Sequence, residues 1–371
     1  MKIIHCADLH LDSKNFSKLT PQKRELKRHQ MLQNFVDMID FAEKNKVTAI
    51  LLCGDIFDEP KVLKKTLKVV QDTILAHKDI TFFYIWGNHD ERVEIFDKKP
   101  SNFVVFKDKF SKVDMGDVCI GGMSFKRQID PKFYENIEFQ KSDFNILMLH
   151  CPVAKDVYCE PVVLKNLASK DIDYVALGHI HLKDEGKIDK RGIWAYSGCL
   201  ESCSFSYIGQ DYGFVLLDIK DGKLTRTFVP FAKYFYRNVE IDVSKLTNFG
   251  DIFKIVGEKT SQFGKNDFVR VVFVGDRQEE NEINVNVVAE KFSNDFFYLE
   301  VLDQTRLLFD LEKIANEKLS LKAEFLNQVL TDKTLGEEEK QQICNVGIEA
   351  LKGEDISLWN WSLVILTRLE S

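Results

Sequence analysis

Five short motifs in the first half of the chain combine aspartate, asparagine and histidine, and each follows an apolar run. In chain order they are Asp8-Leu9-His10, Gly54-Asp55-Ile56-Phe57-Asp58, Gly87-Asn88-His89-Asp90, His150 and Gly178-His179-Ile180-His181. Imidazole, carboxylate and amide groups without cysteine suit Mn²⁺, Fe²⁺ or Zn²⁺. The motifs offer enough ligands for two ions, and two ions roughly 3.5–4 Å apart activate a water and clamp a phosphoryl group.

A structural interpretation competes with this one for each motif taken singly. Any one of the histidines is compatible with a core position, and Gly-Asn-His-Asp alone is an ordinary turn sequence. However, five of the eight histidines fall in these motifs, each after a strand-like run. The joint pattern therefore favours a metal centre.

Strand-like and helix-like segments alternate around the first three motifs. Ile3 to Ala7, Val47 to Cys53 and Thr81 to Trp86 are strand-like, whereas Arg28 to Glu43 and Val62 to His77 have helical spacing. This alternation predicts an α/β sheet. The motifs then stand at the carboxyl ends of its strands, where α/β proteins bind ligands.

After residue 100 the strand signals become shorter and more frequent. The expected strands are Phe103 to Phe106, Val118 to Ile120, Ile146 to Leu149, Tyr174 to Leu177 and Ile193 to Tyr196. A hairpin closing on Asp221-Gly222 is expected to join Gly213 to Ile219 with Thr225 to Phe231. Residues 1–232 are therefore predicted to form a first domain of two packed sheets flanked by helices.

The second half of the chain is expected to contain a small α/β domain at 233–306 and a helical region at 307–371. The domain's expected elements lie near Val239 to Val243, Phe249 to Thr260, Phe268 to Val274, Asn284 to Phe292 and Phe296 to Leu302. The helical region has one apolar stripe at Leu308, Leu311, Ala315, Leu319, Leu326 and Leu330. Thr334-Leu335-Gly336-Glu337 is a capping-box pattern that predicts a further helix start. A last stripe comprises Leu358, Trp361, Ile365 and Leu369.

The net charge of −7 is unevenly distributed along the 371 residues. Residues 307–371 hold 7 lysines and arginines against 12 aspartates and glutamates, which leaves 44 against 46 in residues 1–306. Two divalent ions would make the first 306 residues slightly positive. The acidic composition thus does not exclude a nucleic acid partner for this part of the chain.

Composition also bears on membrane and redox classes. No run approaches 18 apolar residues, so no membrane span is expected, and the first residues lack the pattern of a signal peptide. We therefore expect a cytoplasmic protein. The eight cysteines include no Cys-x-x-Cys pair, which excludes a cysteine zinc ribbon. Cys199 and Cys203 are interpreted as buried, inert thiols in preference to a redox or metal pair.

The order of the five motifs resembles that of the calcineurin-like metallophosphoesterases over residues 1–232. A closer resemblance is to DNA double-strand-break repair nucleases of the SbcD type. It rests on segments 5–12, 147–150, 176–181 and 196–201, which read HCADLHLD, LMLH, ALGHIH and YSGCLE. The phrase HLDS at 10–13 and GIEAL at 347–351 look most like the YhaO branch.

This resemblance implies roles for individual residues. One ion would be held by Asp8, His10 and His181, and the other by Asn88, His150 and His179, with Asp55 bridging the two. His89 would act near the scissile phosphate without being a ligand. Asp58 and Asp90 would orient histidines, as supporting groups do in metal sites. Some repair nucleases carry a histidine where this chain has Asp58, so any catalytic help from that histidine must come from elsewhere here.

The resemblance also implies an activity and partners. The expected activity is two-metal-dependent cleavage of DNA, 3′-to-5′ on duplex ends and endonucleolytic on single strands or hairpins, with Mn²⁺ as the expected ion and Fe²⁺ or Zn²⁺ as alternatives. Residues 233–306 would help to position DNA. Residues 307–371, with Trp359 and Trp361, would dock on the coiled coil of an SMC-like, SbcC-type ATPase. A homodimer through first-domain helices is also implied.

Two other functions remain open at this level. The motifs fit a phosphoesterase that acts on nucleotides or phosphoproteins, because the metal site is shared across the superfamily. A non-catalytic, metal-stabilised scaffold for an ATPase is the second alternative, although the complete set of motifs argues against it. Basic pairs at Lys98-Lys99, Lys126-Arg127 and Lys190-Arg191 are candidate phosphate contacts, and each is equally compatible with a solvated surface.

Overall fold

The computed structural model describes residues 1–14, 16–140, 144–157, 159–202, 204–246, 248–278, 282–308, 314–316 and 320–352. The chain divides into two compact units, residues 1–236 and 237–371. Each unit is built from strands and helices around its own apolar core. A separate helical region from residue 307 stays a prediction.

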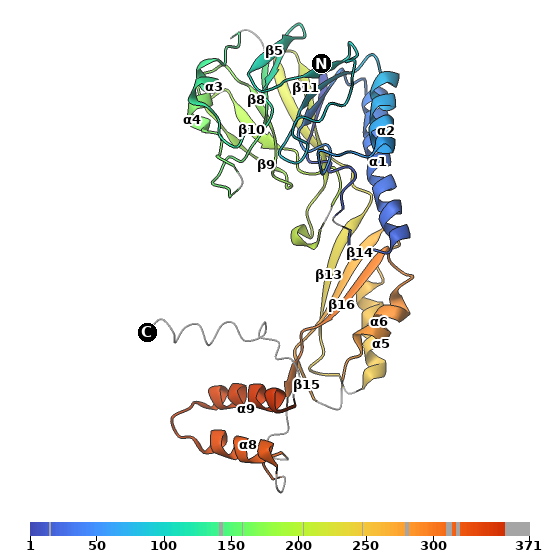
Figure 1. The fold of residues 1–371 in the computed structure, drawn as a ribbon, viewed down its shortest axis with the longest axis vertical. Helices are drawn as coiled ribbons and strands as arrows, with labels where there is room; N and C mark the ends of the chain where they lie inside the picture. Colours follow the sequence, from blue (N-terminus) through green and yellow to red (C-terminus); the bar gives the residue numbers. More distant parts are fainter. Residues whose placement is uncertain are drawn as a thin grey trace. The chain divides into compact units, whose positions relative to one another are not determined.

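The first unit contains two six-stranded sheets (Figure 1). The first sheet has the order β12-β11-β1-β2-β3-β4. Its parallel strands are β1 (Lys2–Cys6), β2 (Ala49–Cys53), β3 (Thr81–Ile85) and β4 (Phe103–Val105). The predicted hairpin of β11 (Gly213–Lys220) and β12 (Lys223–Pro230) is confirmed, and β11 adds antiparallel to β1. Asp221 and Gly222 both take positive φ, as this two-residue turn requires.

The second sheet has the order β5-β6-β7-β8-β10-β9. Its strands are β5 (Ser111–Asp114), β6 (Val118–Gly122), β7 (Phe144–His150), β8 (Tyr174–Gly178), β9 (Asp184–Lys187) and β10 (Ile193–Tyr196). The four inner strands are parallel, whereas β5 and β9 run antiparallel at the two edges. The edge strands were not expected, because short polar segments carry little strand signal.

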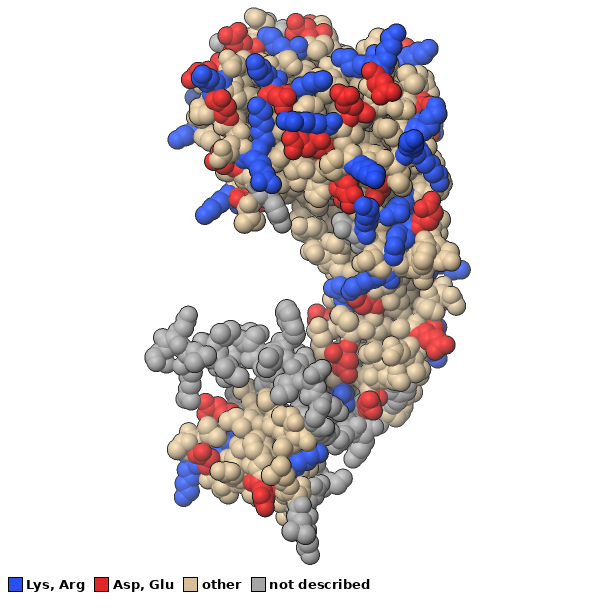
Figure 2. All heavy atoms as spheres, viewed as in Figure 1, with Lys and Arg blue, Asp and Glu red and all other residues tan. Residues whose placement is uncertain are grey.

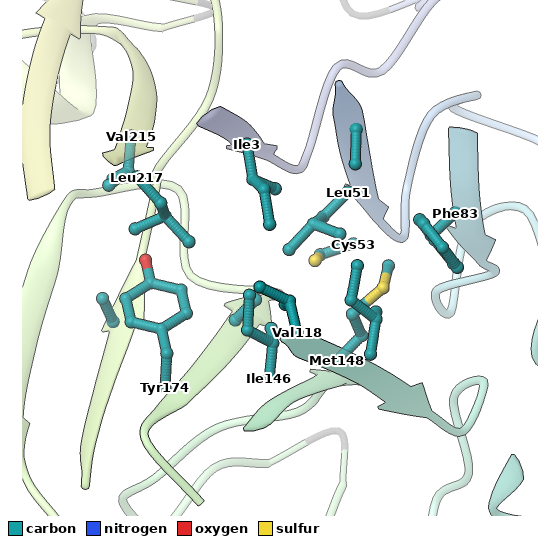
Figure 3. Close-up of a cluster of buried hydrophobic side chains, with 14 of the residues drawn as sticks. Ile3, Leu51, Cys53, Phe83, Val118, Ile146, Met148, Tyr174, Val215 and Leu217 are labelled. Carbon is teal, nitrogen blue, oxygen red and sulfur yellow. The ribbon is translucent and has the colours of Figure 1, made fainter. Parts of the chain in front are cut away.

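The two sheets pack face to face through alternate apolar residues (Figure 3). Ile3, Leu51 and Phe83 of the first sheet point toward Ile146 and Met148 of the second, and all five side chains are buried. The intervening residues of β1 to β3 are buried on the opposite face, because side chains alternate along a strand. The expected architecture of two sheets with flanking helices is confirmed.

Helices flank both sheets. They are α1 (Pro21–Lys44), α2 (Lys64–Ala76), α3 (Pro131–Glu135) and α4 (Leu164–Leu167), with a short 3₁₀ turn, η1 (Phe205–Tyr207). Helix α1 begins seven residues before the predicted start. The Thr20 hydroxyl accepts the Lys23 amide and Pro21 occupies the first turn, and both features favour a helix start. The predicted start was late because the helical spacing of apolar residues begins only at Met31, the first buried apolar residue of the helix.

The second unit has a three-stranded sheet, β13-β14-β16, with two helices. Its elements are β13 (Phe235–Asp242), α5 (Phe249–Thr260), β14 (Asp267–Val274), α6 (Val285–Phe292) and β16 (Tyr298–Asp303). They enclose a core that includes Val256, Val271 and Val288. Two short parallel strands follow the sheet, β15 (Asp276–Gln278) and β17 (Arg306–Leu308). Helices α8 (Leu321–Thr331) and α9 (Glu337–Lys352) form a smaller cluster at Leu326, Cys344 and Ile348.

Two details of the predicted helical region are wrong. Leu308 does not belong to a helical stripe, because it ends β17 beside Gln278. Helix α9 does begin at Glu337, but Thr334 does not cap it. Instead, the carboxylate of Glu339 accepts the Gly336 amide at 3.0 Å. Several residues of the sequence predictions lie outside the described residues: Cys203, Leu311, Leu319, Trp359, Trp361 and the last apolar stripe.

The length and composition of the described helices bear on membrane insertion. None of them combines the length and the apolar composition needed to cross a bilayer.

Candidate metal centre

The backbone at the ends of β1, β2 and β8 is unusually strained. Asp8, His10, Asp55 and His179 have φ angles of 54°, 44°, 52° and 97°. Such angles are uncommon for residues other than glycine, and they cluster at functional sites where the surrounding structure holds them. Four of the predicted ligands are therefore aimed by a backbone conformation that costs free energy.

The exit loops of β1 and β2 run side by side and fix one another. The Asp8 amide donates to the Gly54 carbonyl at 3.1 Å, and the His10 amide donates to the Asp55 carbonyl at 3.0 Å. The two strands thus continue their pairing past the sheet edge. As a result, the first two motifs project their side chains into one place.

Gly54 is required at its position for two reasons. Its φ of 85° disfavours any side chain, and a Cβ there would collide with Nδ1 of His150. Gly178 is similarly closed in, since a Cβ would collide with the Cys53 carbonyl. These contacts explain why the motif glycines precede the ligands: the backbone must pass close to His150.

Asp8, His10 and His181 form the first group of ligand atoms, which all lie within 4.8 Å of one another. Nε2 of His10 lies 3.1 Å from Nε2 of His181. Nδ1 of His10 donates to the Asp58 carboxylate at 3.0 Å. This bond turns the other ring nitrogen of His10 toward His181, so the expected orienting role of Asp58 matches its contact.

Asn88, His150 and His179 form the second group. The side-chain oxygen of Asn88 lies 3.1 Å from Nε2 of His150 and 3.1 Å from Nδ1 of His179. Nδ1 of His150 donates to the Cys53 carbonyl at 2.9 Å, which leaves Nε2 as the nitrogen that faces the group. A carboxylate oxygen of Asp55 lies 3.3 Å from the same Nε2. The ligand atoms of Asp8, Asp55 and His150 also lie within 4.8 Å of one another, and these residues join the two groups.

Two of these contacts turn a nitrogen lone pair toward other electron-pair donors, because Nδ1 of His150 and Nδ1 of His10 already carry the ring proton in their bonds to Cys53 and Asp58. In neutral His150, Nε2 carries a lone pair that faces two oxygens, and two imidazole nitrogens meet at His10 and His181. Only a proton or a cation relieves such contacts. The donor set of oxygen and imidazole nitrogen fits divalent transition ions. The residues present therefore fit a pair of divalent cations.

The pKa values reflect the same crowding. Burial raises the pKa of Asp8 to about 6. Burial also favours a raised pKa for Asp55, but the charge and hydrogen bond of His150 outweigh it and lower the pKa of that carboxyl. For His150 burial opposes protonation, yet Asp55 prevails and the pKa rises to about 9. Burial and the neighbouring His10 lower the pKa of His181 to about 4. A proton on His150 substitutes for a cation.

Asp90 has a different role from the expected one. Its carboxylate accepts the amides of Gly87 at 2.7 Å, Ile56 at 2.8 Å and Asp55 at 3.2 Å, and the Tyr84 hydroxyl at 3.1 Å. It makes no hydrogen bond to a histidine in the described part of the chain. The prediction that Asp90 orients a histidine is therefore wrong: Asp90 ties the Asp55 loop to the turn that carries Asn88.

His89 stands at the rim of the centre. Its side chain is 44% exposed, and its Nδ1 donates to the Asp58 carbonyl at 3.0 Å. Its ring lies edge-on to His10 at 4.9 Å between centroids. Nε2 is thus the nitrogen available to a bound molecule. Ligand atoms of His89, His10 and Asp58 also lie within 4.8 Å of one another, so the non-ligand role of His89 stays a prediction.

Two further residues beside the centre had no sequence signal. Asp156 Oδ1 lies 3.6 Å from Nε2 of His179, and Cys159 Sγ lies 4.0 Å from the same atom. Both line a cavity of about 590 Å³ together with Arg127 and Lys155. They come from the loop after His150, where no motif or periodicity points to them.

Charged side chains are mixed on the visible face of the first unit (Figure 2). Lysines and arginines there are interspersed with aspartates and glutamates. Of the predicted basic pairs, Arg191 binds Asp173 at 2.7 Å and Asp171 at 3.2 Å, which favours a structural role. Arg127 instead lines the cavity next to the centre.

The comparisons with known proteins agree with this geometry. Residues 1–183 match the family model described as calcineurin-like phosphoesterase. The chain carries a calcineurin-like phosphoesterase domain. This domain includes every predicted ligand, from Asp8 to His181.

The chain is similar to proteins named as a metallophosphoesterase, a DNA repair protein and a nuclease component. The chain is 28% identical to the uncharacterized metallophosphoesterase YhaO of Bacillus subtilis, over 75% of this chain and 73% of that protein. It is 23% identical to the DNA double-strand break repair protein Mre11 of Aeropyrum pernix, over 54% and 53%. It is 24% identical to the D component of the nuclease SbcCD of Staphylococcus epidermidis, over 90% and 96%. The expected metallophosphoesterase family is confirmed, with the homologues of the suspected branch among its relatives.

Proposed function

We propose that this chain is a two-metal-dependent DNA nuclease. The observation that carries the proposal is the convergence of imidazole nitrogens, carboxylates and an amide oxygen at one strained strand edge, with the exposed His89 beside it. Asp8, His10 and His181 would hold one cation, and Asn88, His150 and His179 the other, with Asp55 between them. Bound there, the pair would supply a reactive water and neutralise charge on a phosphodiester.

The chain's own residues have distinct tasks in this reaction. Asp58 would hold His10 in place, and Asp90 would hold the loop of Asp55 against the turn of Asn88. His89 would present Nε2 to the substrate, where it would donate a hydrogen bond to a phosphate oxygen or a proton to the leaving oxygen. The Asp58 carbonyl, which accepts from Nδ1, would keep that tautomer.

DNA is the proposed substrate because of the length of the similarity. The relative named as part of the nuclease SbcCD aligns over 90% of this chain, so the likeness extends well beyond the metal ligands. A phosphoesterase acting on small molecules would need only the first unit. We propose cleavage of duplex ends in the 3′-to-5′ direction and of single strands or hairpins internally, with Mn²⁺ as the cation.

The test is digestion of end-labelled linear duplex DNA and of circular single-stranded DNA with Mn²⁺, Fe²⁺ or Zn²⁺. A small chromogenic phosphodiester serves as the reference substrate. His89→Ala is expected to reduce DNA cleavage by about 100-fold or more while metal content is kept, because His89 is a proton donor and not a ligand. Asp55→Ala is expected to lose both activity and metal.

The wild-type comparison decides between substrates. Turnover of the small diester without cleavage of DNA would favour a phosphoesterase for nucleotides or phosphoproteins. Absence of hydrolysis with every cation would leave only a scaffold, and unchanged activity in both variants would place the activity outside this centre. Either result would reject the proposal.

We further propose that residues 307–371 bind a coiled-coil ATPase of the SbcC type. Exposed apolar side chains on α8 and α9 support this, with Leu321 67% exposed, and Ile343 and Leu351 each 38% exposed. Leu321→Asp and Ile343→Asp are expected to abolish co-purification with such an ATPase without changing the nuclease's fold. Undiminished co-purification with both variants would place the contact elsewhere.

A further inference from the structure

An additional cluster of ligand atoms adjoins the proposed dinuclear centre on the far side of His179. Nε2 of His179 faces Asp156 Oδ1 at 3.6 Å and Cys159 Sγ at 4.0 Å, and the three atoms all lie within 4.8 Å of one another. The ring's other nitrogen, Nδ1, faces Asn88. We propose that Asp156, Cys159 and Nε2 of His179 form a third cation position, which takes a thiophilic divalent ion such as Zn²⁺ or Cd²⁺.

The geometry of the cluster suits a tetrahedral ion. Bonds of about 2.0–2.3 Å to nitrogen, oxygen and sulfur place neighbouring ligand atoms about 3.3–3.8 Å apart around zinc. The separations of 3.6 Å and 4.0 Å match this spacing to within a few tenths of an ångström. The third separation, between Asp156 and Cys159, is within 4.8 Å, so a small inward movement of these side chains would close the site.

The ligand types separate this position from the dinuclear centre. The centre's described ligands are carboxylates, an amide and imidazoles, which accept Mn²⁺. The adjoining cluster adds the sulfur of Cys159, and thiolate selects soft or borderline ions over Mn²⁺. The chain thus offers two environments of different preference that share one imidazole.

The cluster is sheltered but reachable. The side chains of His179 and Asp156 are 8% and 22% exposed, and Cys159 is 7% exposed. Asp156 and Cys159 also line the cavity of about 590 Å³, whose wall includes Glu160. An ion can therefore enter from the cavity, and a water from the same side completes its coordination.

The shared ring links the third position to catalysis. A neutral imidazole keeps one N–H, so cations on both Nδ1 and Nε2 require His179 to release that proton to solvent and to bridge them as an imidazolate, and the Cys159 thiol releases its proton in the same way. The two cations then repel one another across the ring. Occupation of the third position should weaken the neighbouring Mn²⁺. The device would make the enzyme sensitive to thiophilic metal through Cys159, and this consequence alone rests on the proposed function.

Metal stoichiometry provides the direct test. Reduced, metal-free protein is equilibrated with Cd²⁺, and bound metal is counted by dialysis while the thiolate-to-cadmium absorption is followed. Wild type should bind three ions per chain with a thiolate band. Cys159→Ala should bind two without the band, its third-site affinity falling by more than about 100-fold, which exceeds the usual loss for a supporting group.

Two variants complete the design. Cys119→Ala, which removes a buried cysteine of β6, should keep three ions and the band. Asp156→Asn should keep the band but bind the third ion about 10-fold more weakly, since a charged ligand is lost. Two ions in wild type, or a band unchanged by Cys159→Ala, overturns the proposal. So does a loss confined to Asp156→Asn, which would make Asp156 only a support for His179.

Activity gives a second readout. With Mn²⁺-loaded enzyme and a small phosphodiester, added Zn²⁺ should inhibit wild type at about 100-fold lower concentration than Cys159→Ala, in line with the affinity lost at the third position. Equal inhibition of both overturns the link to catalysis. A protein that hydrolyses nothing would reject the proposed function, while the dialysis result would still decide the third position.

Discussion

The two units treat the carboxyl ends of their parallel strands in opposite ways. In the second unit, Asp276 after β14 binds Arg306 at 2.8 Å, and Asp303 at the end of β16 accepts the amide of Thr305 at 2.9 Å. These acceptors meet donors within the unit. In the first unit, the oxygen of Asn88 instead faces two imidazole nitrogens.

Backbone strain follows the same division. Every described residue other than glycine with a positive φ lies in the first unit, including four predicted ligands. In the second unit, Gly275 takes the positive φ after β14. A glycine adopts this conformation at little cost, whereas an aspartate or histidine stores strain. The difference indicates that the conformation of the first unit's strand ends is suited to binding a ligand, whereas the strand ends of the second unit are satisfied by contacts within that unit.

The largest effect is expected from Gly54→Ala. The new Cβ would collide with His150 and stand at a φ of 85°, so the free energy of unfolding should fall by about 3 kcal/mol. Metal binding should be lost with it. Urea unfolding and metal analysis measure both.

Gly116→Ala is the matched control for this change. Gly116 has a φ of 80° but no atom within 4 Å of the added carbon. Strain alone should cost about 1 kcal/mol there, with metal content unchanged. Equal destabilisation by the two substitutions would mean that contact with His150 is irrelevant.

A pH-dependent stability of the metal-free protein should come next in size. Burial opposes protonation of His150, but Asp55 raises its pKa from 6.5 to about 9. A raised folded-state pKa stabilises the fold fully below about pH 6.5 and loses that contribution as pH rises through about 9. The loss should reach about 3 kcal/mol. Burial raises the pKa of Asp8 from 3.8 to about 6, so the contribution of Asp8 is also lost as pH rises, but over the lower range from about 3.8 to about 6.

Bound Mn²⁺ should remove the loss between pH 7 and 10, because the cation replaces the proton on His150. Urea unfolding with and without chelator measures the slope. His150→Gln should flatten the chelator curve, since the side chain no longer titrates. Parallel curves with and without Mn²⁺ would show that the cation does not bind where the proton does.

The sequence predicted the centre better than its support. Repeated patterns of Asp, Asn and His after apolar strands predicted residues that the structure brings together, because residue type and strand position are both local properties. The role of Asp90 was missed, because the sequence does not show whether an aspartate at this position accepts from an imidazole or from backbone amides. In the structure it accepts backbone amides. Asp156 and Cys159 were missed because only the tertiary path of a loop brings them to His179.

The same limit applied to the fold. Strands with fully apolar runs, such as β2 and β8, were predicted, because burial on both faces leaves a continuous signal. The edge strand β5 was not, because Ser111–Asp114 is mostly exposed and is specified by pairing with β6. Leu308 has helical spacing with later apolar residues, yet it pairs with Gln278 in a strand. Helical spacing between residues therefore does not show that they belong to the same helix.

Asp58→Ala should produce a selective, intermediate effect. Without the carboxylate that holds Nδ1 of His10, the cation at Asp8, His10 and His181 should bind about 10–100-fold more weakly. The other cation should be unaffected. Calorimetric titration with Mn²⁺ separates the two events.

Asp12→Ala is the control in the neighbouring loop, which follows β1. Asp12 accepts the Leu63 amide at 3.0 Å and the Thr66 hydroxyl, so it supports the start of α2 without touching a histidine. Its loss should cost about 1 kcal/mol of stability with both affinities retained. Equal weakening by Asp12→Ala would assign the effect of Asp58 to general loop disorder.

The smallest effect is expected from Arg306→Ala, which opens the ion pair at the end of the second unit's strands. The partners' side chains are 68% and 35% exposed, and water screens such a pair. The free energy of unfolding should therefore fall by less than about 0.5 kcal/mol. Water can replace the lost donor, because the side chain of Asp276 is partly exposed to solvent. Metal affinity should not change, because every predicted ligand lies in the first unit. Hydrogen exchange of β14 and β16 amides, read beside that of β1 and β2, would detect the change where it arises. A several-fold loss of protection across the second unit would show that its strand ends depend on this single ion pair. The contrast with the metal centre, in which the second unit's strand ends are stable through their own donors and acceptors, would then fail.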